Sequence, residues 1–141
     1  MAVISETSIS LRYFGDDIVP DTLTAALGKQ PTKSTTKGEV ITDQKTGSVR
    51  VAKSGSWLYS VERREPGDLD GQIEELFGAL TADLSVWRTL AETYKPDLFV
   101  GLFMKEFNEG IEISARCMEI LAARGVSLSL DIYGPLQTRD E

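Results

Sequence analysis

Three segments that lie far apart in the chain alternate apolar and polar residues with a period of two, and this alternation constrains the fold more than any other feature. The segments span residues 7–14, 56–62 and 126–133. Successive side chains of a β-strand point to opposite faces of its sheet, so each segment is expected to form a strand with one buried face. Because the other face of all three strands is polar, one face of the sheet is expected to meet water.

A fourth strand is expected at residues 98–104, which are almost all apolar. Such a run is typical of a central strand that is buried on both faces. A turn sequence follows at residues 108–110, and residues 110–113 are expected to return beside it as the second strand of a hairpin. In the last alternating segment, Leu130 and Ile132 belong to the row that is expected to face the core.

Three further segments carry apolar residues at helical spacing. Pro20 and Gly28 are expected to begin and end the first helix, because these residue types are favoured at those helix ends. Ser114 and Gly125 are expected to bound the last helix for the same kind of reason. Asp68 is expected to cap the middle segment, which a break near residue 80 divides into two helices.

This order of strands and helices predicts an α+β fold, with a mainly antiparallel sheet and helices packed on one of its faces. Residues 1–136 are expected to form a single α+β domain. Within that domain, residues 29–53 are polar and are expected to form a loop or a loose hairpin. Residues 137–141 are expected to form a polar tail.

The chain contains no histidine and a single cysteine, Cys117. Catalysis by Ser-His-Asp or Cys-His groups is therefore excluded, and so are ordinary zinc sites, which need histidine or several cysteines. Neighbouring carboxylates occur at Asp16 and Asp17 and at Asp68 and Asp70, but turn and helix-capping roles explain both pairs. We therefore predict no catalytic residue, no metal site and no cofactor, and a binding function is favoured over an enzymatic one.

Compartment and membrane association follow from what the sequence lacks. No apolar run approaches the roughly 20 residues that span a bilayer. The first residues lack the basic and apolar regions of a signal peptide. Together with the lone cysteine, these features predict a cytoplasmic protein that does not enter a membrane.

The charge of the chain bears on its partners. A net charge of −7 argues against nucleic acid, whose affinity for proteins comes largely from neutralised phosphates. The charge is also uneven: residues 29–53 hold six basic and two acidic residues, and residues 65–112 hold eleven acidic and three basic ones. This asymmetry would steer a charged partner, although a solvated loop and solvated helix faces explain it as well.

The polar face of the sheet is the candidate binding face. By the parity of their positions, Arg12, Glu62 and Asp131 project from three strands on the side opposite the core. Phe99 and Phe103 join them if the strand at residues 98–104 keeps the same register. A protein interface and simple exposure to solvent both explain this set. Readout of single-stranded nucleic acid uses similar surfaces, but the acidic balance argues against it.

Several short pieces of sequence, in their order along the chain, resemble a known family. The pieces are FGDD at residues 14–17, LGKQPT at 27–32, KG at 37–38, GSW at 55–57, QIEEL at 72–76, GIEIS at 110–114 and DIY at 131–133. The chain resembles the bacterial family called domain of unknown function 4279 from about residue 5 to residue 133. The resemblance implies a compact α+β domain and brings no catalytic residues with it.

Two classes of function remain open after this reasoning. The leading hypothesis is a non-enzymatic interaction domain, of immunity type, that binds and blocks a protein partner; its acidic surface would then face a basic partner. The alternative is a small-molecule-binding protein, or an unrecognised enzyme, that uses the polar sheet face. A homodimer formed through that face is compatible with either hypothesis.

Overall fold

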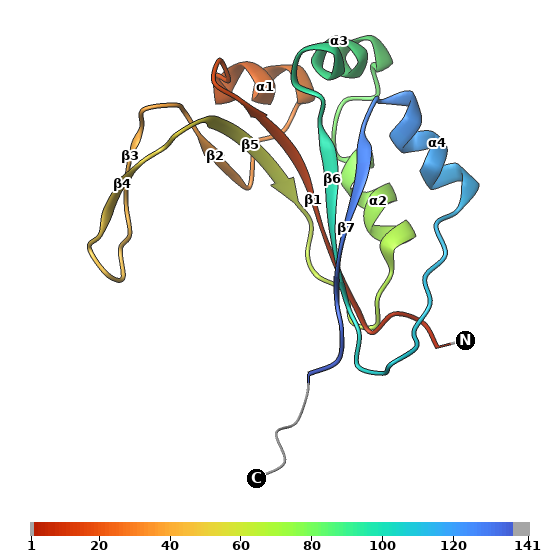
Figure 1. The fold of residues 1–141 in the computed structure, drawn as a ribbon. Helices are drawn as coiled ribbons and strands as arrows, with labels where there is room; N and C mark the ends of the chain where they lie inside the picture. The colour runs from red at the N-terminus through yellow and green to blue at the C-terminus, as the bar shows by residue number, and fades with distance from the viewer. Residues whose placement is uncertain (1, 137–141) are drawn as a thin grey trace.

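A five-stranded sheet forms the centre of the computed structural model, which describes residues 2–136 (Figure 1). The strands run in the order β2-β5-β1-β6-β7. Their bounds are Glu6–Gly15 for β1, Lys33–Thr35 for β2, Gly55–Ser60 for β5, Asp97–Phe103 for β6 and Ser127–Tyr133 for β7. Neighbouring strands are antiparallel except β6 and β7, which are parallel. The prediction of a mainly antiparallel sheet is therefore confirmed.

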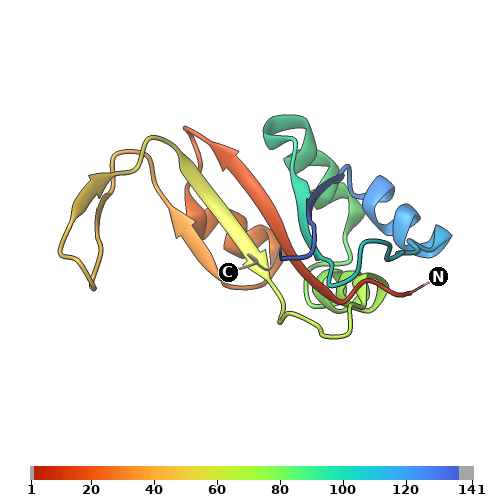
Figure 2. The same ribbon diagram turned by 60° about the horizontal axis from the view of Figure 1, so that its bottom comes forward.

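Within residues 2–136, four helices pack against one face of this sheet (Figures 1 and 2). They are α1 (Pro20–Leu27), α2 (Leu69–Gly78), α3 (Leu84–Tyr94) and α4 (Ala115–Ala123). Several of the predicted helix ends are found. Gly28 follows α1 in a left-handed conformation with φ of 86°. The side chains of Asp68 and Ser114 cap α2 and α4 by accepting hydrogen bonds from the N–H groups of Gly71 and Cys117. The prediction of an α+β fold is confirmed.

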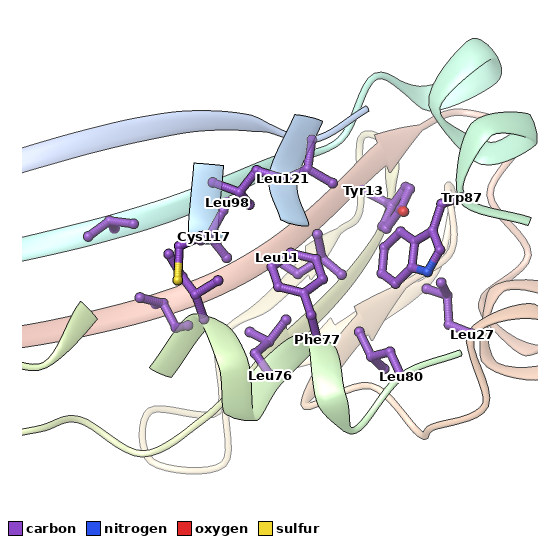
Figure 3. Close-up of a cluster of buried hydrophobic side chains, with 14 of the residues drawn as sticks. Leu11, Tyr13, Leu27, Leu76, Phe77, Leu80, Trp87, Leu98, Cys117 and Leu121 are labelled. Atoms are coloured by element: carbon purple, nitrogen blue, oxygen red, sulfur yellow. The ribbon is translucent and has the colours of Figure 1, made fainter. Parts of the chain in front are cut away.

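The core lies between the sheet and the helices, and the central strand β1 supplies its middle. Leu11 and Tyr13 of β1 are fully buried. Figure 3 shows them beside Phe77 of α2 and Trp87 of α3, whose rings lie 5.5 Å apart. Trp57 of β5 is also fully buried, and its ring meets that of Tyr13 edge to face at 6.1 Å. Aromatic packing of this kind adds to the stabilisation that burial provides.

Residues 29–53, for which the sequence predicts a loop or a loose hairpin, contain three short strands. Lys33–Thr35 joins the main sheet as β2, beside β5. The strands β3 (Val40–Thr42) and β4 (Val49–Val51) pair with each other in a separate hairpin, which projects from the sheet (Figures 1 and 2). Residues 137–141, the predicted polar tail, lie outside the described residues.

The predicted return of residues 110–113 as a hairpin strand is wrong. β6 pairs with β1 on one side and with β7 on the other, so segments distant in sequence occupy both of its edges. The chain after β6 instead forms a loop that the carboxylate of Glu109 closes. It accepts hydrogen bonds from the N–H groups of Ser5, Lys105 and Glu106 at 2.7, 2.8 and 2.7 Å. The bond from Glu106 contributes most to lowering the pKa of Glu109 to about 2.

The sequence predicts that the apolar run at residues 98–104 is buried on both faces, and this prediction is also wrong: only one face is fully buried. Leu98, Val100 and Leu102 are buried against the helices. Phe99 and Phe103 are half-buried on the opposite face, which carries no helix in the described part of the chain. The second face of this strand is apolar because it carries two phenylalanine rings. Other side chains of the sheet cover these rings in part, so the rings need no helix above them.

The row of β7 that is expected to face the core is only partly covered. Leu130 is 44% exposed and Ile132 is 60% exposed. Both lie on the helix side of the sheet, but within residues 2–136 β7 is the last strand in the order and has a neighbouring strand on one side only. The alternation therefore predicts the strand correctly and overestimates the burial of these two residues.

A buried polar network joins the start of β1 to α2. Thr7 and Gln72 are both fully buried. The Thr7 hydroxyl donates to Gln72 Oε1 at 2.6 Å, and Gln72 Nε2 donates to the carbonyl oxygens of Thr7 and Glu62 at 3.1 and 3.0 Å. The Thr7 hydroxyl also accepts a hydrogen bond from the N–H of Asp68. Because buried polar groups are stable only with their hydrogen bonds made, the network fixes α2 against the sheet.

Replacing Gln72 by leucine is expected to lower the free energy of unfolding by about 1–3 kcal/mol, because the change leaves buried hydrogen-bonding groups without a partner. Urea denaturation followed by circular dichroism measures the loss. The control is Gln30→Leu, the same substitution at an exposed residue, which is expected to change stability by less than about 0.5 kcal/mol. Equal stability of the two variants would contradict the role given to Gln72.

Candidate functional site

The sheet face opposite the helices, called the open face from here on, gathers arginine, aromatic and serine side chains. The strand register places on it the even-numbered residues of β1 and β5 and the odd-numbered residues of β6 and β7. Its larger side chains are Glu6, Arg12, Phe14, Leu58, Asp97, Phe99, Phe103, Asp131 and Tyr133, and Lys33 of β2 lies on the same face beside Leu58. The open face is therefore a mixed aromatic and charged surface rather than a purely polar one.

Arg12 stands at the centre of a first cluster on the open face. Its Nε and Nη2 atoms donate to Asp97 Oδ1 and Oδ2 at 2.8 and 2.7 Å, which is a bidentate ion pair. Its guanidinium carbon lies 4.2 Å from the centre of the Phe99 ring and 5.3 Å from that of Phe14. Ser129 of β7 donates a further hydrogen bond to Asp97 Oδ2 at 2.9 Å. Residues of three adjacent strands thus hold the guanidinium in one position.

The protonation of this cluster follows from its contacts. Partial burial alone would raise the pKa of Asp97, but the hydrogen bonds from Arg12 and Ser129 outweigh burial and lower it. The bond to Asp97 in turn raises the pKa of Arg12. Both groups are therefore charged at neutral pH, and the arginine presents its flat face to the aromatic rings rather than to an outside anion.

A second cluster lies further along β6 and β7. The rings of Phe103 and Tyr133 are stacked, with centres 4.8 Å apart and planes 2° from parallel. The guanidinium of Arg63 lies 4.8 Å from the Phe103 ring and forms an ion pair with Glu6 at 3.3 Å. The Tyr133 hydroxyl donates to Asp131 Oδ2 at 2.6 Å, and this hydrogen bond raises the pKa of Tyr133. The second cluster repeats the chemistry of the first, with an arginine on an aromatic ring beside a carboxylate.

Small residues form the floor between the two clusters. Ser10 and Ser60 are linked by a hydrogen bond of 3.0 Å between their hydroxyls. At Gly101, an added Cβ would lie 2.6 Å from the Ser8 hydroxyl and 3.0 Å from the Phe103 ring. Only glycine fits there, and its absence of a side chain lets the Phe103 ring lie across the strand.

The structure brings together four of the five residues that the sequence proposes for the binding face. Arg12 contacts Phe99 in the first cluster. Phe103 and Asp131 both contact Tyr133 in the second cluster. Glu62 lies two residues beyond the end of β5 with an exposed side chain, and it takes part in the fold through its carbonyl oxygen. That these residues bind a ligand stays a prediction.

Sequence reasoning missed several members of the two clusters. Asp97 looks like the first polar residue before a buried strand, and its pairing with Arg12 depends on the register of β1 against β6. Tyr133 and Arg63 are brought to Phe103 by a parallel strand and by the segment after β5. Phe14 and Tyr133 carried a signal in the sequence, because each has the same parity along its strand as a residue proposed for the face, namely Arg12 and Asp131.

A hollow of about 560 Å³ adjoins the second cluster at the end of β6 and β7. Its wall is mostly apolar, and its residues are Ser5, Glu6, Phe103, Met104, Lys105, Ile132, Tyr133, Gly134 and Leu136. At its rim, Lys105 forms an ion pair with Glu65 at 2.6 Å. The volume is within the range of pockets that hold small organic ligands.

The acidic stretch at residues 65–112 is partly neutralised on the helix side. Glu74 pairs with Arg116 at 2.7 Å, and Glu75 pairs with Arg64 at 3.0 Å. In the part of the chain that the structure describes, no three carboxylate or cysteine side chains gather closely enough to hold a metal ion. Among the same residues, no helix has the length and apolar character needed to cross a membrane.

Comparison with known proteins identifies a family for this chain. The model of the family described as Domain of unknown function (DUF4279) matches residues 5–135, which is nearly the whole chain. No curated protein and no solved structure matches the sequence of this chain. The match agrees with the resemblance found in the sequence, and it places both clusters of the open face inside the family domain.

Replacing Asp97 by asparagine is expected to lower the free energy of unfolding at neutral pH by about 1–2 kcal/mol, because the amide loses the charge-assisted bonds from Arg12. A carboxylate whose pKa is lowered in the folded state stabilises the fold above its unfolded pKa and loses this effect as the pH falls through the folded pKa. The difference between wild type and variant is therefore expected to be full at about pH 7 and to shrink below the ordinary Asp pKa of 3.8.

Urea denaturation at about pH 7 and about pH 3 measures this pH dependence. The control is Asp17→Asn, the same substitution at an exposed residue in the turn after β1, with an expected change below about 0.5 kcal/mol at both pH values. A loss for the Asp97 variant that is the same at both pH values would show that the ion pair is not its cause.

Proposed function

We propose that this chain, which belongs to the family described as Domain of unknown function (DUF4279), is a non-enzymatic interaction domain that binds a protein partner on its open face. The observation that carries the proposal is the cluster around Arg12, whose guanidinium is fixed between Asp97 and the ring of Phe99. The proposal includes immunity-type binding, in which the domain blocks its partner.

The composition of the open face supports this proposal. Arginine and aromatic side chains are enriched at the centres of protein interfaces, where a few of them supply most of the binding energy. Phe14 and Tyr133 are 49% and 48% exposed, so both rings keep surface that a partner can cover. Side chains that neighbouring contacts already hold lose less conformational entropy on binding, which favours affinity.

The charges of the open face favour one kind of partner surface. Arg12 and Arg63 both pair with carboxylates on or beside the face, so little net charge is left for a polyanion or a polycation. A partner that offers apolar and hydrogen-bonding groups fits this surface best. A basic partner on the acidic helices has less support, because Glu74 and Glu75 are already paired with arginines.

A photoreactive phenylalanine analogue placed at Phe14 is expected to form a cross-link to a protein partner in cells of the native host, because Phe14 lies on the open face beside Arg12. Mass spectrometry of the cross-linked product identifies the partner. The matched control is the same analogue at Phe107, which is 93% exposed and lies in the loop between β6 and α4.

Cross-linking that occurs at Phe14 and is absent at Phe107 supports the proposal. The substitution Arg12→Ala, combined with the analogue at Phe14, is expected to reduce the yield, because it removes the group that orders the first cluster. Equal yields at Phe14 and Phe107, or a product at Phe107 alone, would contradict binding on the open face.

The hollow beside the second cluster favours a second function, which is the binding of a small organic molecule. Its volume of about 560 Å³ and its aromatic wall suit an aromatic or acyl group. Met104 and Ile132 supply aliphatic surface beside the stacked rings of Phe103 and Tyr133. In this function the chain would recognise its ligand mainly through burial of apolar surface.

Aromatic acids and short fatty acids at about 1 mM are expected to raise the melting temperature if the hollow is a ligand site, since a ligand stabilises the state that binds it. Differential scanning fluorimetry measures the shift. The variant Met104→Glu is expected to abolish the shift, because it places a charge in the apolar wall. An unchanged melting temperature with every member of the panel would count against this function.

A further inference from the structure

We propose that β7 pairs with β7 of a second copy of this chain, so that the two five-stranded sheets join into one continuous sheet. The proposal concerns the outer edge of β7 and is independent of what binds the open face. In the described part of the chain, β7 is the last strand of the sheet (Figure 1). Four observations support the pairing.

The first observation is that the two edges of the sheet differ in their protection. At one edge, β2 has only three residues and begins with Lys33, and short length and lysine both discourage pairing with another chain. At the other edge, β7 has seven residues and contains neither lysine nor proline. Its Leu130 and Ile132 are 44% and 60% exposed. A long apolar edge of this kind is a template for strand addition.

The second observation is the direction of the backbone groups of β7. The N–H of Ser127 donates to Pro96 and the carbonyl of Tyr133 accepts from Met104, so the odd-numbered residues of β7 bond toward β6. Along a strand, the N–H and C=O of successive residues point to alternate edges. The backbone groups of Leu128, Leu130 and Ile132 therefore point outward, away from β6.

The third observation is that this outward set matches itself under a two-fold axis. In antiparallel pairing centred on Leu130, that residue faces Leu130 of the partner subunit, and Leu128 faces Ile132 of the partner subunit. All three outward residues then occupy hydrogen-bonded pairs, in which facing residues exchange both backbone bonds. The apolar row of one strand meets the apolar row of the other, as a two-fold interface requires.

The charges along β7 are compatible with the same register. Asp131 is the one charged residue of β7, and in this register it faces Ser129 of the partner subunit. Like charges that face each other directly would destabilise the pair, and this register contains none. The Asp131 carboxylate already accepts the Tyr133 hydroxyl on the open face, so it need not be buried unpaired.

The fourth observation is an apolar stripe on α4, the helix that precedes β7. Ala115, Met118 and Ala122 follow helical spacing along one side of α4 and are exposed, with Met118 at 53%. Around the axis of α4, Ile120 lies about half a turn from this stripe. Ile120 lines a hollow with Leu84 of α3, so the stripe is on the side of α4 that faces away from α3. In the two-fold pair, Ile132 of the partner subunit lies beside Leu128, where this stripe can cover it.

Light scattering on the full chain after gel filtration tests the pairing. Wild type is expected to be a dimer at about 50 µM, and both Leu130→Lys and Leu130→Glu are expected to weaken the dimer at least about tenfold, because like charges then face each other. An equimolar mixture of the two variants is expected to restore a dimer, since lysine then faces glutamate. The control Val49→Lys changes a residue of β4 that is 63% exposed and is expected to leave the dimer intact.

Any oligomeric state other than those expected for wild type, the Leu130 variants, their mixture and the control would overturn the proposal. A monomeric wild type, dimeric Leu130 variants, a monomeric mixture or a monomeric Val49→Lys variant is incompatible with a two-fold pair centred on Leu130. Hydrogen exchange on wild type provides a measurement that needs no substitution. The amides of Leu130 and Ile132 are expected to gain at least about tenfold protection as the protein concentration rises, whereas those of Ser129 and Asp131 are protected throughout by β6. Protection of Leu130 that does not change with concentration would also overturn it.

Discussion

The helices of this protein cover one face of the sheet, and the side chains of the other face must be stable in contact with water. The central strand β1 meets this constraint with Leu11 and Tyr13 on the helix side and with Arg12 and Phe14 on the open side. An aromatic ring under a guanidinium is partly shielded while the charge stays hydrated. The pair of Arg12 and Asp97 holds that arrangement in place. The same contacts that make the open face stable also give it a fixed shape.

Local patterns in the sequence predicted the elements of the fold well. Alternation located β1, β5 and β7, and capping residues such as Asp68 and Ser114 located the helix ends, because these signals depend on neighbours in the chain. The prediction of a hairpin strand at residues 110–113 was wrong because it depended on which strands lie beside β6. That choice is made by the packing of the helices and by the return of the chain through α4, which no local pattern encodes.

The candidate site was predicted in part for the same reason. Parity along a strand placed Arg12 and Asp131 on the polar face, since parity is a local property, whereas the place of Phe99 depended on the register of its strand. The partner of Arg12 could not be found in this way, because Asp97 reaches it through the register between β1 and β6. Arg63 comes from a segment outside any strand and meets Phe103 only in the folded chain. The sequence proposed Arg12 with Phe99 and Phe103 for this face, and the folded chain adds Asp97, Arg63 and Tyr133 to them.

The open face and the edge of β7 are compatible as two separate surfaces. A two-fold axis perpendicular to the sheet would leave the open faces of both copies on the same side, where they could bind a partner together. The central claim is that the open face is covered by a partner in the native host. Hydroxyl-radical footprinting of Phe14 and Tyr133, with exposed Phe107 as the internal reference, tests it directly. The account predicts that both rings react in the purified protein and are protected in the host cell extract, while Phe107 reacts equally in both. Equal reaction of Phe14 and Tyr133 in the two samples would contradict it.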